Sequence, residues 1–222
     1  IAHHQNLKRT HMKKIAFSTI VAATMISMSA IGVAHAFTIP GMGNSSNAAP
    51  AADLTGQQTA LISTYNKANQ QVFGANVTLS QTLGLKTQTE ALKASAKSLT
   101  EGSTQDSLAS SSVAISENTT AITAKLKENP QLDKASKALY AKGLASLVGG
   151  VKQYLGMTKN VSDMSSGLSA NPMAVAKLQP AVTVVKDFPK SMTQLKDTLT
   201  AAISFAKTNN IPVPADATSV LE

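Results

Sequence analysis

The sequence predicts an all-α fold, an elongated antiparallel four-helix bundle in up-down-up-down order with flexible N- and C-terminal ends. After Leu54, apolar residues recur at alternating spacings of four and three, the period of one face of an α-helix. Two Asn-Pro pairs, Asn129-Pro130 and Asn171-Pro172, interrupt that period, because a residue before proline is disfavoured in the helical region. No stretch of the 222 residues alternates apolar and polar positions as a strand would.

A signal peptide is expected over residues 12–36. Two lysines follow its methionine, a run of uncharged, mostly apolar residues comes next, and Ala34 and Ala36 give the small-x-small pattern that signal peptidase reads. We therefore expect a mature protein that begins at Phe37. The alternative is an uncleaved membrane anchor, for which the apolar run is barely long enough.

Cleavage before Phe37 would remove all four histidines and the single arginine, and the chain contains no cysteine or tryptophan. Nucleophilic catalysis by a Ser-His-Asp triad or a Cys-His pair is then impossible. Haem needs an axial ligand such as histidine, and di-iron sites in helix bundles use Glu-x-x-His pairs. The carboxylates are scattered singly, which disfavours calcium and magnesium. We expect a protein that is not an enzyme and holds no cofactor or metal.

The charge distribution argues against nucleic acid as a partner. The mature chain would keep sixteen lysines against twelve acidic residues, and the two signs are interleaved. A nucleic-acid binder usually shows a clustered basic stripe that contains arginine. The expected location is the periplasm of a Gram-negative bacterium, or the medium beyond its outer membrane, and without cysteine the fold must be stabilised by burial alone.

The two ends of the chain lack helical periodicity. Residues 1–11 fit neither a leader nor a fold, and we interpret them as an over-extended reading frame or an expression-vector remnant. Residues 37–52 are rich in Pro, Gly, Asn, Ser and Ala, which predicts a flexible linker. The helical bundle is expected over 53–208, and residues 209–222 are expected to form an extended tail.

The first two helical segments lie before Asn129-Pro130. One is expected from Asp53, as its N-cap, to a turn at Gly84, and the next from Thr87 onwards with a register slip at residues 101–103. The seam after the slip consists of Leu108, Ser112, Ile115, Thr119, Ile122 and Leu126. Because Ser and Thr occupy several of these positions, this helix is expected to be the least tightly packed.

The third segment is expected over residues 131–169 and the fourth from there to Asn209. The third is apolar on two faces between Leu139 and Met157, which predicts a central position in the bundle. The fourth contains Pro180 and Pro189, which are expected to kink or split it.

Four glycines inside the third segment are expected to serve helix packing: Gly143, Gly149, Gly150 and Gly156. They form two pairs a heptad apart, and each mid-helix glycine costs about 1 kcal/mol relative to alanine. Close approach of a neighbouring helix would offset that cost. The alternative is a segment that inserts into or lies on a membrane, although its lysines bracket too few uncharged residues to span a bilayer.

Two short motifs carry little weight. Ser204 and Lys207 match the Ser-x-x-Lys pattern of some hydrolases, but the partner motifs of that class are missing. Four asparagines each begin an Asn-x-Ser/Thr triplet, which we attribute to the richness of the chain in these residue types: Asn44, Asn76, Asn118 and Asn160.

The sequence therefore predicts an exported, non-catalytic helical bundle that acts as a structural or protein-binding module of the bacterial envelope. Its partner would bind an apolar helix face or one of the two ends. The alternative is a membrane-active or lipid-binding bundle whose helices open around Leu139–Met157 and meet a membrane surface.

Overall fold

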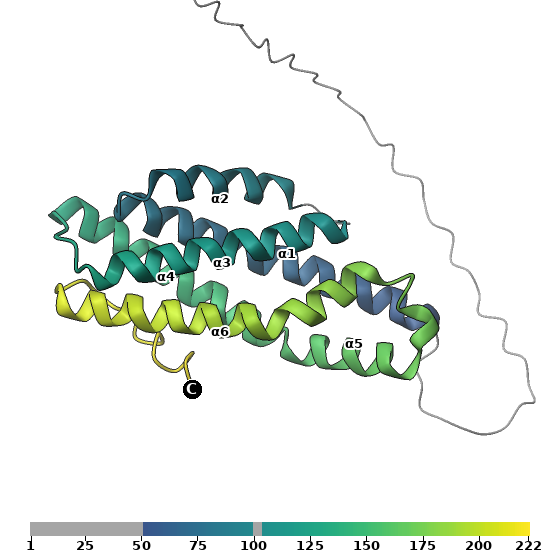
Figure 1. The fold of residues 1–222 in the computed structure, drawn as a ribbon. Helices are drawn as coiled ribbons and strands as arrows, with labels where there is room; N and C mark the ends of the chain where they lie inside the picture. The colour runs from purple at the N-terminus through teal and green to yellow at the C-terminus, as the bar shows by residue number, and fades with distance from the viewer. Residues whose placement is uncertain (1–50, 100–103) are drawn as a thin grey trace, which may run out of the picture. The chain divides into compact units, whose positions relative to one another are not determined.

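The computed structural model describes residues 51–99 and 104–222, and all regular secondary structure in these two ranges is helical (Figure 1). The all-α prediction is therefore confirmed for the described chain. The expected signal peptide, its cleavage site at Ala34, Ala36 and Phe37, and most of the expected linker lie outside the described residues. The helices are α1 (Ala51–Thr82), α2 (Lys86–Ser98), α3 (Gln105–Lys127), α4 (Lys134–Gly156), α5 (Thr158–Ala170), the 3-10 helix η1 (Pro172–Ala174) and α6 (Gln179–Thr208).

The expected count of four long helices is wrong. The second predicted segment is two antiparallel helices, α2 and α3, and the third divides at Met157 into α4 and α5, which follow one another in the same direction. The described chain thus makes five passes, with α1, α3 and α6 parallel to one another (Figure 1). Spacing of apolar residues is the same in either direction along a helix, so the sequence did not indicate that α3 runs back against α2. The expected register slip at residues 101–103 lies outside the described residues.

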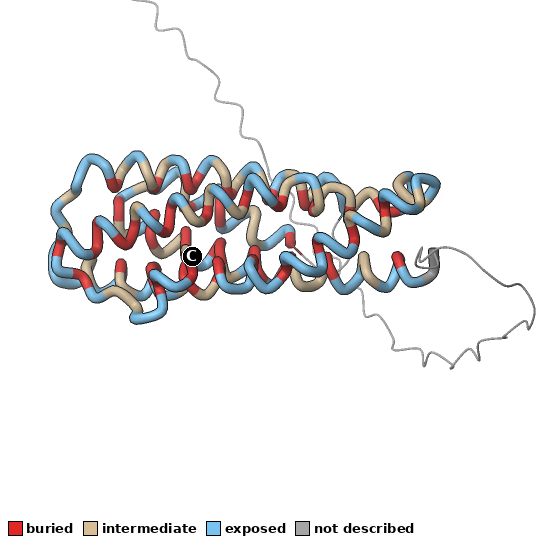
Figure 2. The backbone as a smooth tube through the Cα atoms, turned by 90° about the horizontal axis from the view of Figure 1, so that it is seen from below, coloured by how far each residue is buried: buried red, intermediate tan, exposed pale blue. Residues whose placement is uncertain are grey.

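Helix α1 is the centre of the bundle, because it packs against α2, α3, α4, α5 and α6. The expected central helix, α4, does bury a broad face, which consists of Tyr140, Gly143, Leu144, Leu147, Val148, Gly150, Val151 and Tyr154. Figure 2 shows buried residues alternating with exposed ones along the helices of the bundle. Two expected core residues of α4, Leu139 and Leu155, are instead exposed. The apolar band of α4 is therefore one wide face against α1 and α6, without a second, separate one.

The helix boundaries follow from local chemistry. Gly84 adopts a left-handed φ of 75° between α1 and α2, and Asn129 has φ 49° at the end of α3. The Asp133 carboxylate accepts the backbone N–H of Ser136 at 2.7 Å and caps α4. Pro189 lies inside α6 and does not split it, and Pro180 belongs to its first turn.

Residues 209–222 do not form the expected extended tail. They pass through a series of turns in which Ile211, Ala217 and Val220 are buried. Three lysines hold this segment to the helices: two donate to the carbonyls of Asn209 and Leu221, and the third pairs with Asp216. The buried apolar residues of this segment therefore extend the core.

Candidate functional site

The contact between α1 and α4 is the closest helix packing around the predicted glycines. A Cβ on Gly150 would lie 2.8 Å from Val72 Cγ2, and one on Gly143 would lie 3.0 Å from Leu79. A Cβ on Gly149 would meet only the amide of the long Gln71 side chain, and Gly156 has open space at that position. Gly143 and Gly150 thus face α1 closely, whereas Gly156 was wrongly assigned to helix packing.

A fifth glycine was missed. Gly167 on α5 lies against Leu54 in the first turns of α1, so that a Cβ there would overlap the leucine side chain. It continues the same face of the antiparallel α4–α5 pass that carries Gly143 and Gly150, since each of these glycines opposes a residue progressively nearer the start of α1. Gly167 lies seventeen residues after Gly150, and a helix boundary separates the two. Heptad spacing in the sequence therefore does not identify it.

Aromatic rings bind α1, α4 and α6 to one another. Tyr154 lies edge-on to Tyr65 at 6.0 Å between ring centroids and stacks on Phe188 at 5.8 Å, and Tyr140 packs against Phe205 at 5.1 Å. The Tyr140 hydroxyl donates to the carbonyl of Ala202, and the Tyr154 hydroxyl donates to the Asn69 side chain. Burial raises the pKa of both Tyr140 and Tyr154, so these phenols stay neutral within the core.

Several asparagines are buried in the same core. Asn69 and Asn76 on α1 and Asn118 on α3 are each at most 2% exposed, and Asn118 donates its amide to Ser80 Oγ at 2.8 Å. Both polar atoms of Asn76 and the carbonyl oxygen of Asn118 have no hydrogen-bond partner among the protein atoms. An unmet buried polar group costs about 1–3 kcal/mol, so this row weakens the bundle. The asparagines of two Asn-x-Ser/Thr triplets, Asn76 and Asn118, are thus buried.

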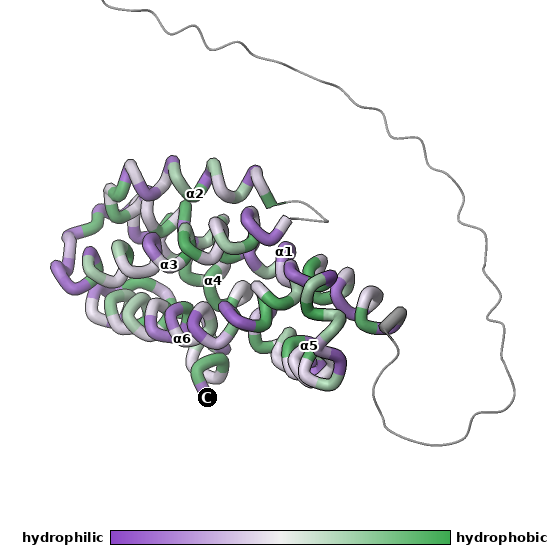
Figure 3. The backbone as a smooth tube through the Cα atoms, turned by 45° about the vertical axis from the view of Figure 1, so that its right-hand side comes forward, coloured by the Kyte–Doolittle hydropathy of each residue, from purple (hydrophilic) through white to green (hydrophobic). Residues whose placement is uncertain are grey.

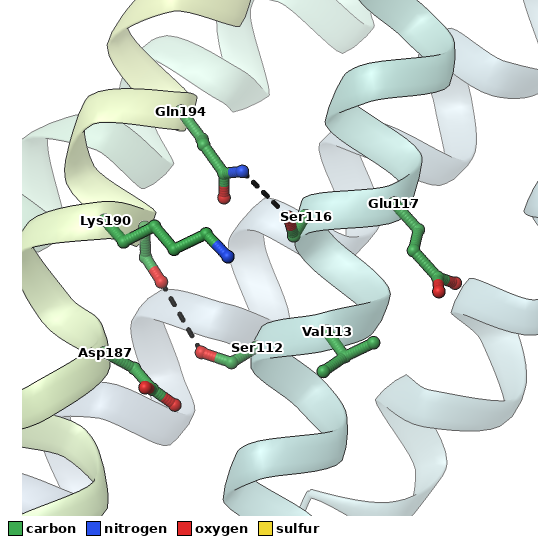
Figure 4. A pocket seen from close by; sticks show the side chains of 8 residues that line it. Ser112, Val113, Ser116, Glu117, Asp187, Lys190 and Gln194 are labelled. Carbon is green, nitrogen blue, oxygen red and sulfur yellow. Dashed lines mark hydrogen bonds between the residues drawn. The ribbon is translucent and has the colours of Figure 1, made fainter.

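A polar seam joins α3 to α6. Ser112 Oγ lies 3.5 Å from Ser191 Oγ, Gln194 donates to Ser116 Oγ at 2.8 Å, and the hydroxyls of Thr123 and Thr198 are 3.4 Å apart. A hollow of about 190 Å³ opens beside the first two contacts, with Lys190 extended across it towards α3 (Figure 4). Further hollows follow the same two helices towards their C-terminal ends. The seam is rich in hydroxyls and poor in large apolar side chains.

An apolar groove lies at the other end of α6. It has a volume of about 610 Å³ and is lined by Leu168, Pro172, Val175, Val182 and Val185, together with two serines and Lys186. Figure 3 shows the hydropathy of α5 and of the chain around it from this side.

A second hollow shares Pro172 with that groove and contains Met173, whose side chain is 90% exposed. The charged side chains that line these two hollows are lysines, Lys177 and Lys186. Together the two hollows combine a large exposed apolar side chain with an apolar groove, and we call this surface the α5–α6 groove. The sequence pattern did not single it out, because its valines also fit the core-facing period of α6.

Within the described part of the chain, the residue types that could bind a metal do not cluster, and the two residues of the Ser-x-x-Lys pattern are not joined. No group of three or more His, Cys, Asp or Glu side chains converges in residues 51–99 and 104–222. Ser204 and Lys207 are both exposed, and no hydrogen bond joins them. In the same ranges no helix combines the length and the apolar character needed to cross a bilayer.

Comparisons with protein-family models, with curated proteins and with solved structures found no match for this chain. Its function must therefore be argued from its own surfaces.

Proposed function

We propose that this chain is an exported, non-catalytic protein-binding module of the bacterial envelope, and that the α5–α6 groove holds its protein partner. The observation that carries the proposal is the exposure of Met173 beside a groove lined by Leu168, Val182 and Val185. Exposed apolar surface that borders a concavity is typical of protein-binding sites. Methionine in particular adapts its shape to a bound apolar segment.

The charges around the groove define the partner more closely. Lys177 and Lys186 flank the apolar residues, and no acidic side chain lines either hollow. A partner segment with apolar residues flanked by aspartate or glutamate would complement this surface. The proposal is therefore a protein segment of that composition, in a helix or an extended stretch.

Photo-crosslinking in a Gram-negative host tests this function. A photoreactive amino acid at Val182 should give a discrete protein adduct, and the same group at the exposed Ala138 on α4 should not. Lys186→Glu should abolish the adduct, because it reverses the charge at the groove, whereas Lys142→Glu on the exposed side of α4 should leave it. Adducts that are absent, or identical from both positions, would contradict the proposal.

Export is tested separately from binding. Expressed with its own leader, the protein should be found in the periplasm or the medium with an N-terminus of Phe37-Thr38-Ile39. A membrane-bound product that still begins at Met12 would contradict it.

One observation favours the membrane-active alternative. Hydroxyl and amide contacts such as Ser112–Ser191 and Asn118–Ser80 join α3 to α6 and α1, and α3 also buries apolar side chains in the core, so that its displacement would uncover an apolar interior. Liposome co-sedimentation separates the two functions. Sedimentation of the mature protein with vesicles, together with lipid adducts at Val182, would favour the membrane-active function.

A further inference from the structure

We propose that the α2–α3 hairpin is a conformational unit that opens away from α1 and α6, while α1, α4, α5 and α6 stay packed. Its two hinges are Gly84, between α1 and α2, and Asn129-Pro130, between α3 and α4. This inference concerns the fold itself and does not depend on which partner the α5–α6 groove binds.

Three of the hydroxyl contacts that hold α3 in place are long, whereas the bond from Gln194 to the Ser116 hydroxyl, at 2.8 Å, is not. The Tyr65 and Ser112 hydroxyls are 3.2 Å apart, the Ser112 and Ser191 hydroxyls 3.5 Å, and the Thr123 and Thr198 hydroxyls 3.4 Å. The usual O–H···O distance is about 2.7–2.8 Å, so these three bonds are weak. Water can replace each of them when the hairpin leaves.

Other polar side chains of α3 are satisfied within their own helix. The Ser111 hydroxyl donates to the carbonyl of Ser107 at 2.8 Å, and the Thr119 hydroxyl donates to that of Ile115 at 2.9 Å. Both residues are buried, yet both bonds would travel with α3. Opening therefore breaks two short side-chain hydrogen bonds of α3, Gln194–Ser116 and Asn118–Ser80, each at 2.8 Å. Its main cost is the exposure of the apolar side chains that α3 buries, which are Leu108, Ile115, Ile122 and Leu126.

The buried amide groups that lack hydrogen-bond partners also favour opening of the hairpin. Asn118 on α3 keeps one bond, to Ser80, but its carbonyl oxygen has no protein partner, and neither polar atom of Asn76 has one. Asn76 lies one helical turn before Ser80 on α1. Opening the α1–α3 contact would hydrate these atoms, and the hydration offsets part of the apolar contact that is lost.

The remaining helices are joined by aromatic pairs and close glycine contacts in which α2 and α3 take no part. Gly150 lets Val72 approach α4 closely, and Tyr154 links α1 to α6 through its contacts with Tyr65 and Phe188. Near the start of α1, Gln58 accepts the backbone N–H of Ala181 at 3.3 Å. The apolar and aromatic contacts among α1, α4 and α6 do not pass through α2 or α3.

The connections at both ends of the hairpin suit a hinge. Gly84 and Asn129 have φ values of 75° and 49°, which their residue types tolerate. Hinges are commonly a few residues at the ends of elements that absorb the change in backbone angles. Each of these sites lies directly between the hairpin and a helix that stays in place.

Hydrogen exchange of the unmodified mature protein is the first test. The most protected amides of α2 and α3 should exchange at least about tenfold faster than those of α4, through an opening that exposes less surface than global unfolding. Equal protection in α3 and α4, with one denaturant dependence, would overturn the proposal.

An engineered disulfide between α3 and α6 is the second test. Because the chain contains no cysteine, the two introduced residues can pair only with each other within one molecule. Ser112→Cys with Ser191→Cys joins α3 to α6 at a pair whose oxygens are 3.5 Å apart, and Thr123→Cys with Thr198→Cys provides an independent pair at 3.4 Å. Oxidation of either should slow exchange in α2 and α3 about tenfold or more relative to α4, with the reduced form of the same variant as control. An equal effect on all helices would show that no separate opening exists.

Discussion

Gly150 on α4 lies directly against Val72 on α1, so that a Cβ on the glycine would come within 2.8 Å of the valine methyl group and 3.4 Å of the valine backbone nitrogen. The valine side chain is branched at Cβ and has little freedom to turn aside. At this point, therefore, the distance between the two helices depends on the absence of a side chain.

Gly150→Ala should consequently destabilise the protein despite the better helix propensity of alanine. Overpacking a core typically costs about 1–3 kcal/mol, and the propensity gain of about 1 kcal/mol offsets only part of it. Chemical denaturation of the mature protein measures the difference.

Gly74→Ala is the matched control, because Gly74 lies in the middle of α1 with nothing within 4 Å of its Cβ position. It should stabilise the protein by about 0.5–1 kcal/mol. If Gly150→Ala and Gly74→Ala changed the free energy of unfolding by the same sign and amount, the helices α1 and α4 would be able to move apart at little cost, against this prediction.

Asn76→Leu should raise the free energy of unfolding, or leave it unchanged, although Asn76 is fully buried. Both of its polar atoms lack a protein partner, and replacing an unsatisfied polar group by an apolar one of similar size removes a penalty of about 1–3 kcal/mol. Asn160→Leu, on the exposed side of α5, is the control and should change stability by less than about 0.5 kcal/mol. A clear loss on Asn76→Leu alone would mean that the amide is well satisfied in solution.

The sequence predicted the helical class and the seams, because a period of 3.6 residues survives any arrangement of helices. It predicted the close approach at Gly143 and Gly150 for a similar reason, since an unexplained glycine inside an apolar helix implies a neighbour. It did not predict that the chain reverses between Leu99 and Thr104, because the apolar spacing is the same in both directions.

The candidate site was less accessible to sequence reasoning. Val182 and Val185 have the spacing of core residues, and only the arrangement of α5 against α6 leaves them beside a groove. In the sequence, Asn76 and Asn118 stand out only as members of Asn-x-Ser/Thr triplets, since no local pattern distinguishes a buried asparagine from an exposed one. Surfaces made by distant segments require the tertiary fold.

The buried tyrosines predict a loss of stability in alkali. The pKa of Tyr140 and Tyr154 is raised by burial, so above about pH 10 the unfolded chain releases protons that the folded chain retains. The unfolded state then binds fewer protons, and the free energy of unfolding falls as pH rises. Below pH 10 this contribution is constant.

Denaturation between pH 8 and 11, with phenolate absorbance as a second signal, measures this effect. Ionisation of the two buried phenols should coincide with unfolding. Tyr140→Phe, which removes one buried phenol, should reduce the slope of stability against pH above pH 10, and an unchanged slope would contradict the assignment.

The packing of the C-terminal residues predicts that they stabilise the bundle. Ile211 is 4% exposed, and the neighbouring Asn209 carbonyl accepts from Lys137 on α4 at 2.7 Å, so the segment is fixed where the isoleucine enters the core. Ile211→Ala should therefore cost about 2–5 kcal/mol, the usual range for removing a buried isoleucine side chain. Thr218→Ala, at an exposed position of the same segment, should cost less than about 0.5 kcal/mol. If both substitutions have the same small effect, the segment detaches in solution and presents its apolar side chains to a partner; a large effect of Ile211→Ala alone leaves the α5–α6 groove as the better-supported binding surface.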